Sequence, residues 1–304
     1  MGRGAVSLAD RLLRGGVRAL SWPPLGLARA VGRGLAGLAL RLDQRHRRIA
    51  LNNLSASFPE KDPGWVQATA KACFAHLGQV VSEIPQVAMR SAAELHAQAR
   101  FHGLEDLYRA WGRGQGVILL TGHFGNWEWA NLAGGVELGR GAVVVARPVD
   151  WPPADRLVND WRCKAGGEVV PKNRSARALL RALKENRLLG ILLDQNVDWY
   201  DGEWVEFFGR PACTNKGLAL LARSTGAPVV PFYNWRGSDG RFDVHFGPEV
   251  PLVKTADKTQ DIWDNTQNYT RVLEEIIRQR PEQWFWLHQR WKTRPFHAWP
   301  RERR

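Results

Sequence analysis

The sequence predicts an α/β fold, in which a mostly parallel central sheet is flanked by helices. From residue 115 onward, short apolar runs alternate with longer amphipathic segments, as they do where strands are joined by crossover helices. Polar residues follow three of these runs directly, which is typical of the carboxyl edge of a parallel sheet, where sites collect. The 304 residues suit one large α/β domain or two small ones.

The elements can be placed in chain order. A first helix is expected over residues 65–90. The predicted strands, recognised as short apolar runs, are residues 117–120, 142–146, 169–170, 188–193, 228–233 and, at an edge of the sheet, 242–246. The helices that alternate with them or follow them are expected at residues 175–185, 218–224 and 261–279.

The first fifty residues differ in character from the rest, because many arginines occur there with only Asp10 and Asp43 as acids. One helical face collects the apolar residues Leu27, Val31, Leu35, Leu38 and Leu42. Arg29 and Arg33 fall nearly opposite. A helix packed on the protein's own core would fit this pattern, and so would a helix lying in a membrane surface. The density of arginines favours the membrane surface.

Neither a membrane-spanning helix nor a signal peptide is expected in this segment. Arginines and the pair Pro23-Pro24 interrupt every apolar run before it reaches the eighteen or so residues that a span needs. An unbroken apolar core with a cleavage pattern is missing as well. We therefore expect residues 1–45 to form a basic amphipathic membrane-associated segment and residues 46–304 to form the main domain.

The formal net charge of +13 favours an anionic partner, which could be nucleic acid, an acidic protein or an anionic membrane. The basic residues form no helix-turn-helix, RRM or zinc pattern, so nucleic-acid binding is the remote alternative. One basic stripe, on the helix predicted at residues 175–185 and just before it, is either a solvated face or a docking surface for an acidic partner. Its residues are Arg174, Arg177, Arg181 and Lys184.

The three cysteines are scattered and form no CxxC pair. This argues against a disulfide framework or a zinc cage, so we expect no metal and a reducing compartment.

The apolar run at residues 117–120 leads into the sequence GHFGNWE at residues 122–128. The glycines indicate a loop, and Asn126 is a suitable N-cap for the helix that follows. Glu128 then lies in the first turn, where the helix dipole favours an ionised carboxylate. On one regular helix His123 and Glu128 would be about 140° apart, so they can meet only if His123 is on the loop.

This arrangement is suited to a general base. A carboxylate on one nitrogen of the His123 ring fixes the tautomer, and the other nitrogen is free to take a proton. The spacing also fits a solvated loop histidine beside a helix-start Glu128, and the spacing alone leaves both interpretations open. Arg147 and Asp194 follow two other predicted strands, so three polar candidates converge on one edge of the sheet.

These residues belong to an ordered set of motifs that resembles the bacterial lipid A late acyltransferase family and its lysophospholipid-acyltransferase-like relatives. The likeness runs from about His46 to Pro295. The GHFGNWE segment resembles the family's His-x4-acid motif in its glutamate version. The other matching segments are HRRIALNNL at 46–54, FPE at 58–60, RP at 147–148, DQ at 194–195, FFGRPA at 207–212, TGAPVVP at 225–231, PEQWFWLH at 281–288 and RWKTRP at 290–295. His-x4-acid alone is a weak signal, whereas the ordered set is specific.

The resemblance implies a glycerolipid acyltransferase-like fold and a catalytic domain over residues 46–304. It implies transfer of a fatty acyl chain from acyl carrier protein to a hydroxyl of a lipid A precursor. His123 would take the proton of that hydroxyl, and Glu128 would orient its ring and stabilise the imidazolium.

The remaining site residues follow from the same resemblance. Arg147 and the backbone N–H groups near Asn126 and Trp127 would stabilise the developing negative charge, or Arg147 would hold a substrate phosphate. Asp194 and Gln195 would position groups at the edge of the site. Structural roles for Arg147, Asp194 and Gln195 remain open alternatives.

The implied partners are acyl carrier protein, an anionic lipid acceptor and the cytoplasmic face of the inner membrane, with peripheral or monotopic attachment. No cofactor is expected, because the carrier protein brings the acyl donor as a substrate. A lysophospholipid, an ornithine lipid or another glycolipid is the alternative acceptor, since nothing in the sequence defines the acceptor pocket.

Overall fold

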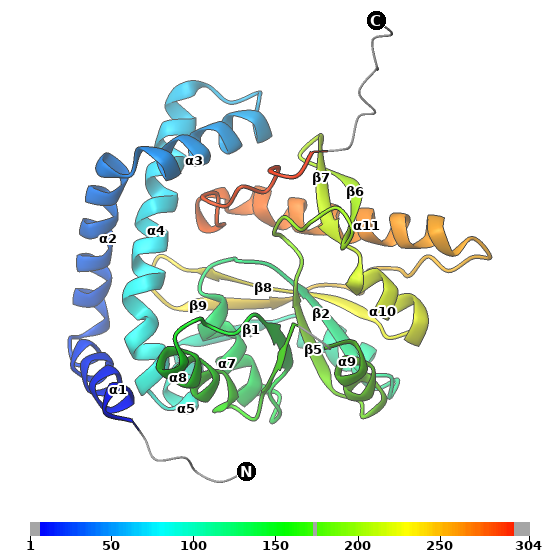
Figure 1. The fold of residues 1–304 in the computed structure, drawn as a ribbon, viewed down its shortest axis with the longest axis horizontal. Helices are drawn as coiled ribbons and strands as arrows, with labels where there is room; N and C mark the ends of the chain where they lie inside the picture. Colours follow the sequence, from blue (N-terminus) through cyan, green and yellow to red (C-terminus); the bar gives the residue numbers. More distant parts are fainter. Residues whose placement is uncertain (1–6, 173–174, 295–304) are drawn as a thin grey trace, which may run out of the picture.

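A computed structural model describes residues 7–172 and 175–294 (Figure 1). Its main sheet has the strand order β1-β9-β8-β2-β5-β3-β4 among the described residues. The strands are β1 (Ala99–His102), β2 (Val117–Thr121), β3 (Val143–Ala146), β4 (Glu168–Pro171), β5 (Leu188–Leu192), β8 (Val229–Arg236) and β9 (Phe242–Phe246). Within this sheet the pairing is parallel except between β8 and β9, which are antiparallel. The predicted fold class is confirmed.

The predicted strands are present, but one expectation about the sheet was wrong. We expected residues 242–246 at an edge, whereas β1 pairs with β9 and forms the edge itself. Strand β1 has the sequence ARFH, in which half-buried and exposed residues alternate, so it lacks the apolar run by which the other strands were recognised. An antiparallel hairpin of β6 (Gly202–Phe207) and β7 (Arg210–Asn215) was also missed.

Helices surround the sheet (Figure 1). Their bounds are α1 (Leu8–Leu20), α2 (Leu25–Leu42), α3 (Gln44–Ser57), α4 (Pro63–Met89), α5 (Ala92–His96), α6 (Leu104–Trp111), α7 (Trp127–Glu137), α8 (Pro152–Cys163), α9 (Ser175–Lys184), α10 (Gly217–Thr225), α11 (Lys258–Gln279) and the 3₁₀ turn η1 (Pro281–Gln283). The helices predicted at residues 65–90, 175–185, 218–224 and 261–279 correspond to α4, α9, α10 and α11.

Two apolar cores lie on opposite faces of the sheet, because successive side chains of a strand point to opposite sides. Val117 and Leu119 of β2 pack in the core that includes α7 and α8. Ile118 and Leu120 pack in the core that includes α9, α10 and α11. All five residues of β2 are buried, as expected for a central parallel strand covered on both sides.

Helix α2 packs along α4, and the two backbones meet at Gly32 and Gly78. A Cβ atom on Gly32 would lie 2.3 Å from the carbonyl oxygen of Gly78, and one on Gly78 would lie 2.2 Å from that of Gly32. Only glycine fits at such a crossing. None of the described helices is long and apolar enough to cross a membrane.

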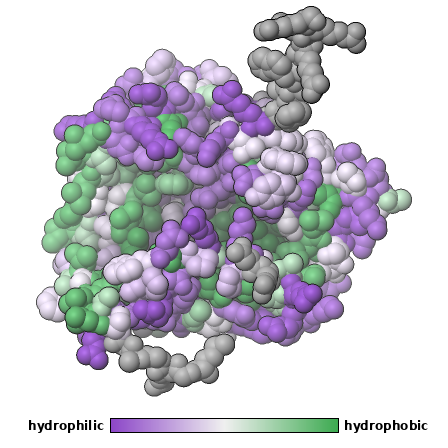
Figure 2. All heavy atoms as spheres, viewed as in Figure 1, coloured by the Kyte–Doolittle hydropathy of each residue, from purple (hydrophilic) through white to green (hydrophobic). Residues whose placement is uncertain are grey.

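The outer face of α2 carries the predicted apolar stripe, and each of its residues is more than half exposed: Leu27, Val31, Leu35, Leu38 and Leu42. With Leu12 and Leu20 of α1 and with Trp22, they form an apolar margin of the molecule, on the left in Figure 2. Arg29 lies nearly opposite this stripe, as predicted. It turns inward to pair with Glu83, and its side chain is 11% exposed.

The basic stripe is described only in part. Arg177, Arg181 and Lys184 are exposed on α9, whereas Arg174 lies outside the described residues, as does Pro295 at the end of the last motif. The exposed positions remain compatible with both interpretations given above.

Candidate active site

The loop after β2 carries the histidine, and its glycines allow two close approaches. Gly125 has φ of +52°, and a Cβ atom there would lie 2.4 Å from the backbone oxygen of Asn234. A Cβ atom on Gly122 would lie 2.9 Å from the carboxyl carbon of Asp194. Glycine at these two positions therefore lets the loop fold closely against β8 and against Asp194, two residues beyond the end of β5.

Asp194 binds His123 through both its ring and its backbone. The Nδ1–H group donates to Oδ1 of Asp194 at 2.9 Å, and the backbone N–H of His123 donates to Oδ2 at 2.8 Å. Trp284 Nε1–H also donates to Oδ2, at 2.7 Å. Asp194 is 2% exposed, so these donors take the place of water around a buried carboxylate.

Each partner of the pair favours the charged form of the other. Burial opposes ionisation of Asp194, but the charge of His123 and the hydrogen bonds from His123 and Trp284 outweigh it and lower the pKa of Asp194 to about 2. Burial likewise disfavours the imidazolium, but the charge and hydrogen bond of Asp194 outweigh it and raise the pKa of His123 above its ordinary 6.5. Glu128 raises this pKa further through its charge, without a hydrogen bond to the ring.

Glu128 does not hold the ring as we expected. Its carboxylate accepts a two-pronged contact from Arg162, with Nε–H donating to Oε2 at 3.0 Å, and a hydrogen bond from Trp161 Nε1–H at 3.2 Å. The predicted helix start is correct, since α7 begins at Trp127 with Asn126 as its N-cap. From the first turn of α7, however, Glu128 faces α8, where Arg162 neutralises the charge of its carboxylate.

Asn126 also differs from its predicted place among substrate-binding groups. It is 1% exposed, and its side chain accepts from Trp129 N–H at 3.0 Å and donates to Glu83 at 2.8 Å. Its backbone N–H, which we expected to face the developing charge, donates to Asn234 at 3.0 Å. Asn126 therefore holds the His123 loop in place through buried hydrogen bonds and does not face the cavity.

A cavity of about 600 Å³ opens beside the histidine. His123, Trp127, Glu128 and Gln195 line it, and Gln195 Nε2 lies 3.4 Å from His123 Nε2. The ring of Trp127 meets that of His123 edge-on, with centroids 4.8 Å apart. The His123 ring therefore lines the cavity while its Nδ1 is hydrogen-bonded to Asp194.

The cavity reaches both faces of the sheet through an opening between β3 and β5. Pairing of these strands ends at Val144 and Gly190, whereas β5 stays paired with β2 as far as Leu192. The lining includes Phe232 from one apolar core and Leu218 from the other. The deeper part of the cavity is therefore apolar and lies between the ends of β3 and β5.

Cationic side chains gather at the same cavity. Arg147, Arg162 and Lys172 all line it. Arg147 is in its predicted position after β3, is 78% exposed, and pairs with Asp150 at 3.0 Å. Arg162 is instead mostly buried against Glu128. The cavity thus combines an apolar interior with cations at its rim.

Sequence reasoning brought His123, Trp127, Gln195 and Arg147 to this cavity but missed several groups that hold the site. Arg162, Trp284 and Glu83 had no local signal, because each contacts the site from an element far away in the chain. Asp194 was recognised at a strand end, but its contact with His123 was not predicted.

A histidine paired with a buried carboxylate, at the carboxyl edge of a parallel sheet and over an apolar cavity, is suited to moving a proton on or off a hydroxyl. The chain belongs to the bacterial lipid A biosynthesis acyltransferase family, whose model matches residues 8–293. The family predicted from the ordered motifs is thereby confirmed, and membership supports an O-acyltransferase.

Several curated proteins are similar over most of the chain. The Lipid A biosynthesis lauroyltransferase of Escherichia coli (strain K12) is 28% identical over 87% of this chain and 85% of its own length. The Lipid A biosynthesis myristoyltransferase of the same organism is 25% identical over 86% and 79%. A Phosphatidylinositol mannoside acyltransferase of Mycobacterium tuberculosis (strain CDC 1551 / Oshkosh) is 29% identical over 62% of this chain and 58% of its own length.

Proposed function

We propose that this protein transfers a fatty acyl chain from acyl carrier protein to a hydroxyl of a lipid A precursor, at the cytoplasmic face of the inner membrane. The observation that carries the proposal is the His123 ring, which Asp194 binds at Nδ1 and which lines a cavity with an apolar interior. Membership of the lipid A biosynthesis acyltransferase family supplies the reaction class.

In the proposed reaction His123 Nε2 takes the proton of the acceptor hydroxyl as its oxygen attacks the thioester carbonyl carbon. The C–O bond forms, the carbonyl oxygen becomes an oxyanion, and collapse breaks the C–S bond. The leaving thiolate recovers the proton from the imidazolium. Asp194 fixes the Nδ1–H tautomer and stabilises the imidazolium through its hydrogen bond, which replaces the His123–Glu128 contact that we expected.

Donors for the oxyanion would come from side chains at the cavity. Gln195 Nε2 lies close to His123 Nε2, and Arg147 stands exposed at the rim. Arg147 is equally suited to a phosphate of the acceptor, because a guanidinium binds phosphate oxygens through two parallel hydrogen bonds.

The acyl chain would occupy the apolar opening between β3 and β5, which removes it from water. Acyl carrier protein is acidic, and Lys172 at the cavity offers a charge of the opposite sign, as do the exposed cations of α9: Arg177, Arg181 and Lys184. The apolar face of α2 would lie in the membrane surface, where exposed leucines and flanking arginines are both favourable.

A different glycolipid acceptor is the second candidate. The observation in its favour is the similarity to the mycobacterial phosphatidylinositol mannoside acyltransferase, whose identity matches that of the lipid A enzymes over a shorter span. Both candidates use the same base and the same acyl cavity.

The deciding experiment compares lipids from cells that lack the protein with lipids from cells that overexpress it, by mass spectrometry. We expect one additional acyl chain on lipid A when the protein is present, and none when His123→Ala replaces it. A gain of mass confined to another lipid would transfer the proposal to that acceptor. Unchanged lipids in the presence of folded wild-type protein would contradict acyl transfer altogether.

A further inference from the structure

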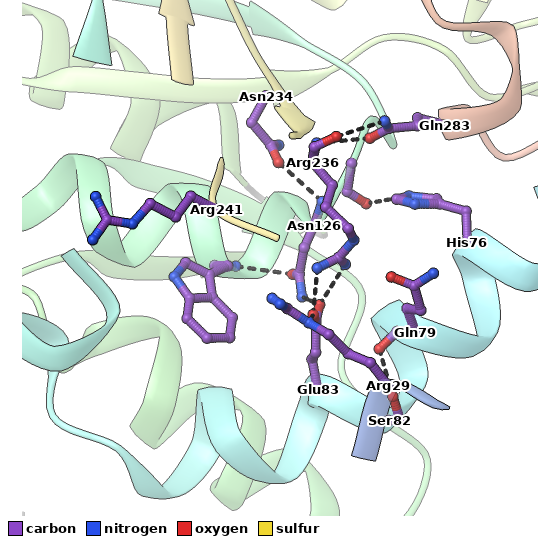
Figure 3. A network of polar contacts seen from close by, with 12 residues as sticks. Arg29, His76, Gln79, Ser82, Glu83, Asn126, Asn234, Arg236, Arg241 and Gln283 are labelled. Carbon is purple, nitrogen blue, oxygen red and sulfur yellow. Dashed lines mark hydrogen bonds and ion pairs between the residues drawn. The ribbon is translucent and has the colours of Figure 1, made fainter. Parts of the chain in front are cut away.

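Glu83 of α4 lies at the centre of a buried polar network (Figure 3). Its side chain is fully buried and accepts hydrogen bonds from three others. Arg236, the last residue of β8, donates through two guanidinium nitrogens, one of them at 2.7 Å from Oε2. Arg29 of α2 donates through Nε, and Asn126 donates through Nδ2 at 2.8 Å.

This network is connected to the loop that carries His123. Asn126 caps α7, and the loop leaves β2 only a few residues earlier. Helix α4 also contacts the same loop through His76, whose Nε2–H donates to the carbonyl oxygen of Gly125 at 3.0 Å. Gln283 accepts from Gly125 N–H at 3.0 Å and bonds to the backbone of Arg236, so it joins the loop to the end of β8.

The network also reaches the surface helix α2. Arg29 supplies the polar contact, and the crossing at Gly32 and Gly78 supplies a backbone contact about one turn away. Arg29 lies on the side of α2 that faces α4, whereas Val31 and Leu35 lie on the exposed apolar face. A single buried carboxylate therefore contacts both the N-cap of α7 and the helix with the apolar stripe.

Folding stability alone does not explain why Glu83, Arg29 and Arg236 are buried together. Removing a carboxylate and two guanidinium groups from water costs about as much free energy as their attraction returns, and apolar side chains of similar volume often stabilise a core more. Moreover, Arg29 Nη2 and Arg236 Nε are buried without a hydrogen-bond partner among the described residues. The hydrogen bond from Asn126 to the charged Glu83 fixes the orientation of the Asn126 amide, which an apolar side chain would not do.

We propose that Glu83 is a positioning residue for His123, which it holds in place through Asn126, and that Arg29 ties the same carboxylate to α2. The inference rests on the proposed role of His123 as the base. Burial opposes ionisation of Glu83, but the two arginines outweigh it and lower its pKa, so the carboxylate stays charged and keeps both contacts.

The test measures the titration of the His123 ring by NMR, with its signal assigned from the His123→Ala variant. In the wild type burial lowers the pKa of His123 and Asp194 more than offsets this, with smaller effects of Glu128 and Arg162. Glu83→Gln keeps the size of the side chain but removes the charge. We expect the loop to shift, the contact with Asp194 to lengthen, and the pKa of His123 to fall. In the acyl-transfer assay kcat should fall about tenfold or more, with KM for the acyl donor unchanged.

Loss of stability alone would lower the amount of active protein without moving the His123 titration. A folded Glu83→Gln variant with wild-type titration and wild-type kcat would overturn the proposal. If Glu83→Gln does not fold, Glu83→Asp takes its place, because it keeps the charge and withdraws the carboxylate from Asn126. A folded Glu83→Asp variant with unchanged titration would overturn the proposal equally.

The link to α2 has a matched pair of variants. Arg29→Gln removes the contact with Glu83, and Arg33→Gln removes an exposed charge one turn away on the same helix. We expect Arg29→Gln to lower the pKa of His123 and Arg33→Gln to leave it unchanged. Identical titrations in the two variants would overturn the link. Because these titrations need no substrate, they remain decisive even if the proposed acyl transfer fails.

Discussion

His123 and Asp194 occupy equivalent positions on two neighbouring strands. Thr121 of β2 pairs with Leu192 of β5. His123 lies two residues beyond Thr121, and Asp194 lies two residues beyond Leu192. Neighbouring strands are about 4.8 Å apart, so the pairing itself brings the imidazole and the carboxylate within hydrogen-bonding distance. The observed separation between Nδ1 and Oδ1 is 2.9 Å.

This relationship predicts that Asp194, more than Glu128, supports the base. Asp194→Asn should lower kcat by about 10²–10⁴-fold, because an amide favours the wrong tautomer of His123 and cannot stabilise the imidazolium. Glu128→Gln should have an intermediate effect, since it weakens the contact with Arg162 but leaves the His123 ring bound. The measurement is acyl transfer from acyl carrier protein, with circular dichroism as the folding control. Equal losses in the two variants would contradict this division of roles.

The pH dependence of the reaction follows from the raised pKa of His123. Only the neutral ring can accept a proton, so kcat/KM should fall as the pH drops through a value above the ordinary 6.5. In Asp194→Asn the larger of the factors that raise this pKa are lost and only the charge of Glu128 remains, so the acid limb of the residual activity should move to lower pH. An acid limb at the same pH in both proteins would assign it to another group.

Gly190 is predicted to limit the acyl chain. A Cβ atom there would lie 3.1 Å from Cγ1 of Val144, at the point where β3 and β5 separate. Gly190→Ala should shift the preference toward shorter acyl donors, by about tenfold, since a single methylene in an apolar pocket is worth 1–3 kcal/mol. The assay compares kcat/KM across donors of different length.

Gly34→Ala is the control for this substitution, because a Cβ atom at position 34 of α2 meets nothing within 4 Å. It should leave the preference for chain length unchanged. If both variants kept the wild-type preference, the acyl chain would have to lie elsewhere.

The exposed apolar face of α2 predicts which substitution weakens the proposed binding to membranes. Leu35 is 63% exposed, so Leu35→Glu should cost little folding stability. It should weaken co-sedimentation with anionic vesicles by about tenfold or more, because burying a leucine side chain contributes 1.5–3 kcal/mol. Leu220→Glu on α10 changes a similarly exposed leucine, 47% exposed, away from this face and should bind vesicles as the wild type does. Equal binding by Leu35→Glu and Leu220→Glu would show that α2 is not the attachment surface.

Local patterns predicted the elements, whereas their neighbours in space were not predictable from the same patterns. The run at residues 117–120 and the N-cap Asn126 are properties of adjacent residues, and both were placed correctly. We chose Glu128 as the partner of His123 because it is near in sequence. The true partner depends on β5 lying next to β2, and strand order leaves no trace in an apolar run.

Contacts between distant segments explain the other omissions. Glu83 and Arg236 are 153 residues apart, and the sequence of α4 predicts a helix without showing which residue Glu83 contacts. Arg29 illustrates the same limit. Its place opposite the apolar stripe was predicted, but that side of α2 faces α4, so the arginine is buried in an ion pair and is not solvated.

The crossing of α2 and α4 has a mechanical consequence. If α2 turned and advanced by one residue, the side chain of Val31 or Arg33 would take the place of Gly32 and collide with the carbonyl group of Gly78. The close contact therefore opposes a change of register between the two helices. Helix α4 in turn contacts the loop of His123 through His76 and, by way of Asn126, through Glu83. The backbone contact thus fixes where the leucine face lies relative to the helix that supports the His123 loop.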